Sequence, residues 1–437
     1  KTPFWKGSRA STVCARAPAP RFTVTPRTIE PRRVAVTGMS VATALGFELE
    51  TFWSAILAGE SGIRRMDFAS ELDLPVRIGG CVDRAGLKEA AARYKLKDKD
   101  DWHLMGLYVV GRALEHAGFA TDRSAPIEAD VIVGTGHGNV VATNEGMAAF
   151  QETGPRRVRP TAVLRSMSHR IASLASIQFG LTGASHVVSC ACASASVAIG
   201  QAFQQVRFGM ADRAVAASAD SGFDPATFSA WNRLGVLSPI EDPARASRPF
   251  DAAREGLVMG EGAAALVLEA WEVAEARGAT ILGEILGYGA SSDASHLLQP
   301  KAEGQVVAIQ RALRDAGLQA SDLGYVNAHG TGTELADVVE AESIQLALGD
   351  AGRTVPVSNT KAQLGHLMGA TAGVELITTL LALRDGKLPP SRNLDDPDPR
   401  CPLNFVRDEP LSSDARYALK NSFAFGGSNS VVVVGRG

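Results

Sequence analysis

Short apolar runs alternate with longer amphipathic stretches along the chain from residue 33 onward. The first run, residues 34–38, is rich in β-branched side chains and ends in glycine, which is typical of a buried strand that enters a turn. Residues 50–57 then show the spacing of an amphipathic helix. By the same criteria we predict strands at 131–134, 186–189, 214–217, 264–268, 325–327, 355–358 and 430–434, and helices at 105–117, 192–208, 305–316, 337–348 and 372–384.

The order of these elements predicts the fold class. Apolar strands separated by helices are typical of α/β layers in which helices cover both faces of each sheet. The alternation runs through residues 33–275 and again through residues 276–437, so we predict two α/β halves. Residues 1–32 combine Arg, Pro, Ser and Ala with almost no acidic side chain, and we interpret them as an extension, tag or linker outside the fold.

Composition and charge narrow the possible functions. The 437 residues are 45% apolar and 21% charged, which is an ordinary globular composition. A net charge of -3 provides no overall basic field for nucleic acid or an anionic membrane, and no apolar run approaches the ~20 residues of a membrane helix. We therefore expect a cytoplasmic protein that neither binds nucleic acid nor inserts into a membrane.

The cysteines argue against a metal site and a disulfide framework. The only close pair, Cys190 and Cys192, lacks the C-x-x-C spacing of zinc and thioredoxin sites. Few cysteines and the lack of a secretory-type leader favour a reducing cytosol.

Cys192 is the first candidate for chemistry. A predicted strand, a turn of small residues and a predicted helix follow one another here, which places this cysteine at a helix N-terminus. The helix dipole and free backbone N–H groups stabilise a thiolate there and lower its pKa, as a nucleophile requires. The alternative is a small buried hydrophobe, and we interpret Cys190 as a cysteine of that inert kind.

Two histidines, His329 and His366, are the next candidates. Each lies beside glycine shortly after a strand-like run, where a side chain faces a cleft and the backbone approaches a ligand closely. The turn that contains Gly426 and Gly427 offers backbone N–H groups for an oxyanion hole, although by itself it is only a tight turn. The other six histidines are typical of structural or surface positions: His103, His116, His137, His169, His186 and His296.

Taken together, these segments resemble the β-ketoacyl–acyl carrier protein synthases, specifically the elongating ketosynthases that use one cysteine and two histidines. The resemblance runs in register from about residue 33 to residue 437 and includes residues 34–46, 57–63 and 248–263. It implies a thiolase fold of two similar halves stacked in α-β-α-β-α layers. It also implies a homodimer, or a heterodimer with an inactive paralogue, that acts with an acyl carrier protein.

The resemblance assigns roles to individual residues. Cys192 stands where the family has its acyl-accepting nucleophile, and His329 and His366 stand at its two histidines. Lys361 matches the lysine that supports the second histidine, and Glu375 matches an acidic residue of the surrounding hydrogen-bond network.

Further matches concern the substrate. Thr331 and Thr333 match residues that contact the pantetheine arm. Phe425 matches a gatekeeping phenylalanine, whose backbone N–H forms the oxyanion hole together with that of Cys192. We expect the two glycines that follow this phenylalanine to contact the substrate as well.

The implied reaction is a decarboxylative Claisen condensation. An acyl thioester on Cys192 is attacked by the enolate that forms when a malonyl-type extender loses carbon dioxide. N–H donors of His329 and His366 stabilise this enolate, so we expect no metal and no organic cofactor, only substrates carried on phosphopantetheine. The enzyme is then an acyltransferase of fatty acid or type II polyketide biosynthesis.

Two alternatives remain open at this point. One is an acyltransferase or decarboxylase of the same fold, and the other is a non-catalytic partner subunit of another ketosynthase. A starter-type synthase typically carries asparagine at one histidine, a loading decarboxylase carries glutamine at position 192, and a chain-length-factor partner usually lacks the cysteine. The sequence contains none of these substitutions.

His137 and Asn139 depart from the family pattern. They lie in a segment that lines the acyl pocket in the family, where fatty acid enzymes usually have aliphatic residues or glycine. Our hypothesis is a shortened or polar pocket that favours an acyl chain other than a long saturated one. The alternative is that position 137 has no effect on substrate choice.

An acidic carrier protein requires a basic docking patch. Basic residues occur near segments that line the entrance in the family, although Lys and Arg are mostly solvated surface residues in any protein. The predicted docking residues are Arg64, Arg65, Arg93, Lys95, Lys97, Arg207 and Arg213.

Overall fold

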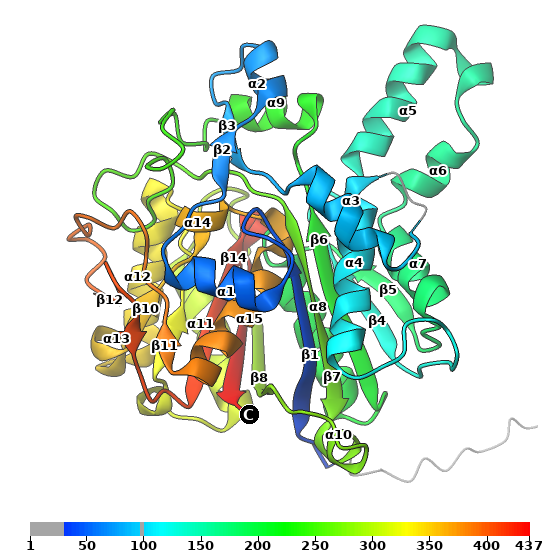
Figure 1. Ribbon diagram of the computed structural model, residues 1–437. Coiled ribbons are helices and arrows are strands. Elements are labelled where there is room, and N and C mark those ends of the chain that lie inside the picture. Colours follow the sequence, from blue (N-terminus) through cyan, green and yellow to red (C-terminus); the bar gives the residue numbers. More distant parts are fainter. Residues whose placement is uncertain (1–29, 97–99) are drawn as a thin grey trace, which may run out of the picture. The chain divides into compact units, whose positions relative to one another are not determined.

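The computed structural model describes residues 30–96 and 100–437 (Figure 1). Most of the expected N-terminal extension and Lys97 therefore lie outside the described residues. The described part is built around one 11-stranded mixed sheet. In spatial order its strands are β12 (Asn404–Phe405), β10 (Pro356–Ser358), β9 (Tyr325–Asn327), β14 (Tyr417–Ala424), β15 (Ser428–Arg436), β8 (Gly283–Ser292), β1 (Val34–Ala42), β7 (Gly262–Ala270), β6 (Arg213–Asp220), β4 (Asp130–Gly134) and β5 (Ser185–Val188).

Helices and two small strand pairs surround this sheet. The strand pairs are β2 (Ile63–Arg65) with β3 (Ile78–Gly80), and β11 (Lys387–Leu388) with β13 (Leu411–Ser412). The helices of the described residues are α1 (Leu49–Leu57), α2 (Asp67–Glu71), α3 (Arg84–Ala92), α4 (Asp101–His116), α5 (Val140–Thr153), α6 (Thr161–Ser166), α7 (Arg170–Phe179), α8 (Ser194–Arg207), α9 (Pro225–Leu234), α10 (Trp271–Ala276), α11 (Ala302–Ala316), α12 (Glu334–Leu348), α13 (Ala351–Thr354), α14 (Lys361–Leu364) and α15 (Thr371–Asp385).

The sheet contains the same strand arrangement twice. β1, β7, β6, β4 and β5 form one half, and β8, β15, β14, β9 and β10 form the other. In each half the first two pairs in this order are antiparallel and the last two are parallel. Parallel neighbours require crossover connections, and α8 and α15 occupy equivalent crossovers in the two halves. The halves join where β1 pairs antiparallel with β8.

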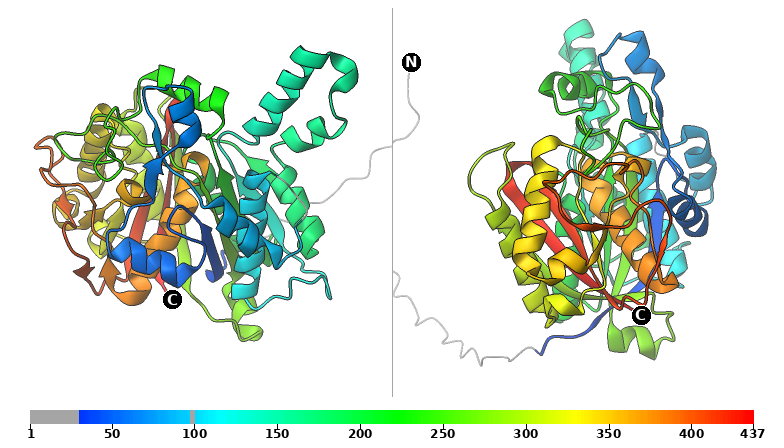
Figure 2. Two further views of the ribbon diagram at one scale, coloured as in Figure 1. Left: turned by 45° about the horizontal axis from the view of Figure 1, so that its top comes forward. Right: turned by 90° about the vertical axis from the view of Figure 1, so that its left-hand side faces the viewer.

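Helices separate and cover the two halves of the sheet. α8 contacts β4, β6 and β7 of the first half and β8 and β15 of the second, and α15 likewise contacts β7, β14 and β15. α4 and α7 cover the outer face of the first half, whereas α11, with α12 packed against it, covers the outer face of the second (Figure 2). This α-β-α-β-α order confirms the predicted fold class.

The strands of the first half are buried on both faces. Ile132 and Ala216 pack in the cluster that contains α8 and α15, whereas the adjacent Val131 and Val215 pack in the cluster that contains α4 and α7. Because successive residues of a strand face opposite sides, both sides must be apolar here. This burial explains why the strands appear in the sequence as nearly continuous apolar runs.

Every strand and helix predicted from the sequence is present, but two long strands were not predicted. β8 is interrupted by glycines, and a Cβ at Gly287 or Gly289 would lie 2.4 or 2.1 Å from a carbonyl oxygen of α11, so the close helix requires them. β14 contains the buried polar residues Lys420 and Asn421. Among the described residues, every helix is too short or too polar to cross a bilayer, and no cluster of three or more His, Cys, Asp or Glu side chains is arranged to hold a metal ion.

Candidate active site

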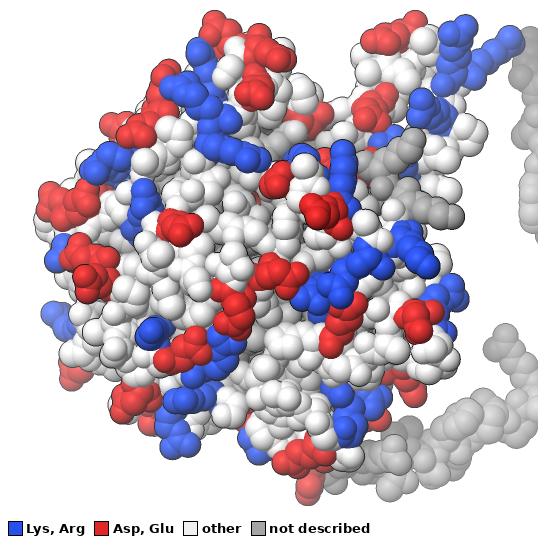
Figure 3. Space-filling view, viewed as in Figure 1, with Lys and Arg blue, Asp and Glu red and all other residues white. Residues whose placement is uncertain are grey.

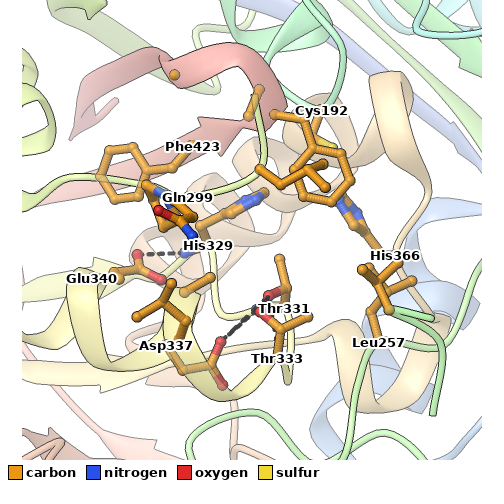
Figure 4. Close-up of a pocket in the computed structure, with 18 of the residues that line it drawn as sticks. Cys192, Leu257, Gln299, His329, Thr331, Thr333, Asp337, Glu340, His366 and Phe423 are labelled. Atoms are coloured by element: carbon orange, nitrogen blue, oxygen red, sulfur yellow. Dashed lines mark hydrogen bonds between the residues drawn. The ribbon is translucent and has the colours of Figure 1, made fainter. Parts of the chain in front are cut away.

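One pocket brings together the cysteine and both histidines selected from the sequence. Cys192 lies in the turn between β5 and α8, His329 follows β9, and His366 follows α14. All three line a cavity of about 200 Å³ (Figure 4). The imidazole rings of His329 and His366 meet edge to face, with centroids 5.3 Å apart and planes at 83°. Residues of both halves of the sheet therefore meet at this cavity.

A tight turn presents Cys192 to the pocket. Ala191 has a φ of 47°, in the left-handed region. The Ser194 hydroxyl accepts the Cys190 N–H at 2.8 Å and donates to the Ala191 carbonyl at 2.6 Å. α8 begins at Ser194, so the cysteine lies two residues before a helix N-terminus, close to where the sequence pattern places it.

The protonation state of Cys192 differs from the expectation. Its side chain is 7% exposed, and burial raises the pKa of the thiol to about 12. The Lys361 ammonium and the backbone N–H groups of Phe425 and Cys192 lower this pKa, but their effect is smaller. The expected lowering of the pKa is therefore wrong, because enclosure of the sulfur outweighs the favourable dipoles. At neutral pH the sulfur of Cys192 is therefore a protonated thiol.

His329 and His366 are both neutral in this pocket. Burial lowers the pKa of each ring well below its usual value, and the charges of Lys361 and Lys420 lower it further. Nδ1 of His366 lies 2.8 Å from Oγ1 of Thr371. Within the described part of the chain, Nε2 of His366 and both ring nitrogens of His329 have no hydrogen-bond partner. These nitrogens are available to a substrate.

A cluster of buried charges adjoins His329. Nζ of Lys361 donates to the carbonyl oxygen of His329 and, at 2.8 Å, to Oε1 of Glu375. Nζ of Lys420 lies 2.8 Å from the other oxygen of this carboxylate. Lys361 thus contacts the backbone of the first histidine, whereas the family resemblance associated it with the second. Lys420 was missed, although a lysine inside an apolar strand is a signal of a buried charge.

Two acidic side chains of α12 hold the loop that carries His329. Glu340 accepts the N–H groups of His329 and Gly330 at 2.7 and 2.6 Å, and Asp337 accepts that of Thr331 at 3.0 Å (Figure 4). Burial raises the pKa of both carboxyl groups, that of Asp337 to about 6. Glu340 was missed, although its spacing of three residues from Asp337 places both on one face of a helix.

The residues selected for substrate contact lie around the same cavity. Thr331, Thr333, Phe425 and Gly427 all line it. The hydroxyl oxygens of Thr331 and Thr333 are 2.9 Å apart. Gly426 lies in the same turn but is exposed and is not a lining residue of the described pocket.

Two family models match the chain. The model for the N-terminal domain of β-ketoacyl synthases matches residues 31–274, and the model for the C-terminal domain matches residues 282–395. The chain belongs to the β-ketoacyl synthase family. This match confirms the resemblance seen in the sequence. The synthase is an acyltransferase of fatty acid or polyketide biosynthesis.

Individual relatives cover almost the whole synthase. A 3-oxoacyl-[acyl-carrier-protein] synthase 2 of Vibrio cholerae serotype O1 is 37% identical over 410 residues, which are 93% of this chain and 99% of the relative. A ketosynthase solved with its type II polyketide acyl carrier protein and bound to the hexaketide has a TM-score of 0.86 at 26% identity. The ishigamide ketosynthase/chain length factor also has a TM-score of 0.86, at 30% identity. Each structure comparison covers 93% of this chain and 100% of the other.

His137 and Asn139 do not line the described pocket around Cys192. Nδ1 of His137 lies 3.1 Å from Oδ1 of Asp220, and its Nε2 accepts the indole N–H of Trp231 at 3.0 Å. Trp231 does line the pocket, so the imidazole is one residue removed from it. Asn139 caps α5 by accepting the N–H of Ala142 at 3.1 Å. Trp231 and Asp220 were not predicted, because their contacts with His137 join positions that are distant in the sequence.

Four of the predicted docking residues are exposed at the surface. Arg64 and Arg65 are exposed on β2, and Arg93 and Lys95 are exposed just after α3. Arg93 forms an ion pair of 3.1 Å with Glu115. These side chains are accessible to a partner.

The other two described docking candidates lie elsewhere. Arg207 is the last residue of α8, the helix whose opposite end adjoins Cys192, and Arg213 begins β6. Arg207 donates to the Leu286 carbonyl at 3.0 Å, and Arg213 pairs with Glu269 at 3.0 Å. The structure therefore does not bring these two arginines to the pocket.

Proposed function

We propose that this synthase accepts an acyl group on Cys192 and lengthens it by decarboxylative condensation with a malonyl-type extender. The observation that carries the proposal is the convergence of a buried thiol and two neutral imidazoles on one cavity. We further propose that residues 33–275 and 276–437 are two units, of which the first supplies the thiol and the second supplies the two imidazoles. The repeated strand arrangement supports this division.

In the first half-reaction, the sulfur of Cys192 attacks the carbonyl carbon of an acyl thioester. The backbone N–H groups of Cys192 and Phe425 stabilise the oxyanion, and their favourable effect on the cysteine sulfur supports this role. The bond to the carrier then breaks, and the departing pantetheine thiolate takes up the proton that the cysteine loses. The unpartnered nitrogens of the neutral rings are available to pass this proton.

In the second half-reaction, the extender loses carbon dioxide and its thioester becomes an enolate. N–H donors of His329 and His366 stabilise the negative oxygen. The enolate carbon attacks the acyl carbonyl, the bond to Cys192 breaks, and the cysteine thiolate takes up one proton. The products are carbon dioxide, a β-ketoacyl thioester and the free thiol.

We propose that an acyl carrier protein delivers both substrates on phosphopantetheine, and that no metal or organic cofactor takes part. Imidazole N–H groups supply the stabilisation of the enolate oxygen that a metal ion supplies in other enzymes. The paired hydroxyls of Thr331 and Thr333 suit the amide groups of a pantetheine arm. A solved complex of a related ketosynthase with its acyl carrier protein supports this choice of partner.

The proposed docking surface centres on Arg64 and Arg65. Figure 3 shows basic side chains gathered beside α2, where β2 lies. Arg65 pairs with Glu241 at 3.1 Å, but both are exposed, so the pair is weak and an acidic partner competes with it.

Arg65→Glu should raise KM for an acyl carrier protein but not for an acyl thioester without the protein. Equal effects on both substrates would contradict this docking surface.

We propose a homodimer built across the first half. β5 is the edge strand of the sheet, and α7 packs beside it. A second copy related by a two-fold axis would extend the sheet and bury the apolar side chains nearby, and a heterodimer with an inactive paralogue would use the same surface. The large exposed apolar residues of α5, α6 and α7 are Val141, Met147, Phe150, Val163, Leu164 and Ile177.

We also retain the proposals of a short or polar acyl pocket and a cytoplasmic location. The first is supported by the modest cavity at Cys192 and by the polar contact of His137 with a residue of its wall. Preferential acylation by palmitoyl thioesters would contradict the short or polar pocket.

The cytoplasmic location is supported by the free state of the described cysteines, Cys81, Cys190, Cys192 and Cys401.

Incubation with acyl and malonyl carrier proteins tests the condensation. We expect acyl mass on Cys192 and a β-ketoacyl product, both lost in Cys192→Ala and both kept in the matched Cys190→Ala. Acylation without a β-ketoacyl product would identify an acyltransferase instead. Failure to acylate at all would identify a non-catalytic partner subunit.

A further inference from the structure

The proposed gate residue, Phe425, rests on Trp231. The two rings are stacked, with planes at 22° and centroids 6.2 Å apart, and both line the pocket that contains Cys192. Phe425 belongs to the turn Phe425–Gly427 (η4), in which Gly426 has a φ of 82°, whereas Trp231 belongs to the regular helix α9. A residue of a regular helix therefore packs against the phenylalanine ring of the turn.

Trp231 is held in turn by His137. The indole N–H donates to Nε2 of His137 at 3.0 Å, and Nδ1 of His137 lies 3.1 Å from Oδ1 of Asp220. Because Nε2 accepts a hydrogen bond, the single proton of the neutral imidazole lies on Nδ1 and is donated to the carboxylate. The imidazole therefore connects a pocket-lining ring to a buried charge.

Asp220 is the fixed end of this chain of contacts. Its carboxylate is fully buried and accepts the N–H groups of Gly136, His137 and Gly369 at 2.8, 3.2 and 2.7 Å. Several N–H donors around one carboxylate satisfy it despite its burial. Gly369 lies in the segment just after His366, so the same carboxylate also anchors the backbone beside an active-site histidine.

We propose that Asp220, His137 and Trp231 form a positioning relay that holds Phe425 at the pocket and thereby selects which acyl chains reach Cys192. The proposal rests on the condensation proposed above and adds the determinants of its substrate choice. Val236, Leu257 and Met368 also line the pocket, but these apolar side chains offer Trp231 no hydrogen bond. The hydrogen bond to His137 fixes the orientation of the indole ring, which apolar packing alone does not.

The relay requires a neutral His137. A second proton would occupy Nε2, toward which the indole N–H already points, so the bond from Trp231 would be lost. Burial lowers the pKa of His137, whereas the charge and hydrogen bond of Asp220 raise it, and the net shift is upward. Two further titratable groups interact with the relay: His137 lowers the pKa of His366, and Asp220 raises the pKa of the Cys192 thiol. The relay is therefore intact above the pKa of His137 and is lost as pH falls through it.

Two substitutions isolate the hydrogen bond. Trp231→Phe keeps an aromatic ring against Phe425 but removes the donor, and His137→Leu removes the acceptor. In acylation of Cys192 by thioesters from acetyl to palmitoyl, each should change the ratio of long-chain to short-chain rates about fivefold, as expected for one neutral hydrogen bond. The double variant should show the same change as either single variant, because all three lack the same bond.

A pH series separates the relay from a purely steric role. The wild-type ratio should shift as pH falls through the pKa of His137, whereas the ratio of Trp231→Phe should stay constant over that range. Trp53→Phe is the matched control. The indole N–H of Trp53 also donates to a side chain, Asp385 at 2.8 Å, but Trp53 does not line the pocket. The ratio of this variant should vary with pH as that of the wild type does.

Four outcomes distinguish the proposals. Unchanged ratios in Trp231→Phe and His137→Leu, or additive changes in the double variant, would overturn the relay. So would a pH-dependent ratio in Trp231→Phe that matches the wild type. Absence of a β-ketoacyl product from the wild type would instead overturn the proposed condensation.

Discussion

Nζ of Lys420 lies 2.8 Å from a carboxylate oxygen of Glu375, and both residues are only 1% exposed. Lys361 contacts the other oxygen at 2.8 Å, so one carboxylate serves two ammonium groups. The surplus of positive charge lies beside His329 and disfavours a charged imidazole there. The cluster therefore helps to keep the ring neutral, which is the state assumed in the proposed stabilisation of an enolate.

Replacement of the shared carboxylate should destabilise the fold. In Glu375→Gln, two buried ammonium groups lose their common counter-charge, so we expect the free energy of unfolding to fall by ~3–5 kcal/mol. Urea denaturation followed by circular dichroism measures this loss.

Lys420→Met provides the matched comparison, because it leaves one lysine and one carboxylate. In the double variant with Glu375→Gln only one unpaired ammonium remains, so the combined loss should be smaller than the sum of the two single losses. Additive losses would show that Lys420 and Lys361 do not share the carboxylate.

His366→Leu should separate the two half-reactions. Acylation of Cys192 should continue, because its oxyanion donors are backbone N–H groups and the ring of His329 remains to pass the proton. Condensation should fall about 100- to 1,000-fold with the loss of one enolate donor. Mass spectrometry of the acyl-enzyme and of the β-ketoacyl product measures both steps. His366→Asn keeps an N–H donor and should retain more condensation than His366→Leu. Equal loss of acylation and condensation would place this histidine in a different role.

The burial of Cys192 makes its reactivity strongly pH-dependent. Only the thiolate is alkylated readily, and burial raises the pKa of this thiol to about 12, so the thiolate fraction rises with pH throughout the neutral range. Alkylation by iodoacetamide, quantified on the Cys192 peptide, should therefore increase about tenfold per pH unit without a plateau near neutrality. Lys361→Met should slow alkylation at each pH relative to the wild type, since the charge of Lys361 lowers the pKa of the Cys192 thiol. A plateau near neutral pH would reveal a preformed thiolate.

The sequence predicted those parts of the fold whose burial is regular. β4 and β6 appear as apolar runs because both faces are covered, and helices such as α11 appear through their amphipathic spacing. β14 was not recognised, because its buried Lys420 and Asn421 find polar partners from other segments. A buried polar residue is interpretable only once its partner is known, and that partner is supplied by the fold.

The same limit applies to the site. Cys192, His329 and His366 were selected because each lies in a local pattern that matches a family: a strand, a turn of small residues and a helix for the cysteine, and a strand-like run followed by glycine for the histidines. The pKa of the cysteine was predicted in the wrong direction, because a local helix N-terminus is visible in the sequence whereas enclosure by residues of both halves is not. The contact between His137 and Trp231 likewise joins two segments that no local pattern connects.

The proposed dimer leads to the last prediction. Ile177 on α7 is 63% exposed beside the edge strand β5, and such an apolar side chain is buried if a second copy extends the sheet. Ile177→Asp would place a charge in that interface, so we expect a monomer in size-exclusion chromatography with light scattering. Leu346→Asp is the matched control, because Leu346 is 59% exposed on α12 of the other half; it should leave the dimer intact. A monomeric wild type, or dissociation by both substitutions, would contradict assembly through the first half.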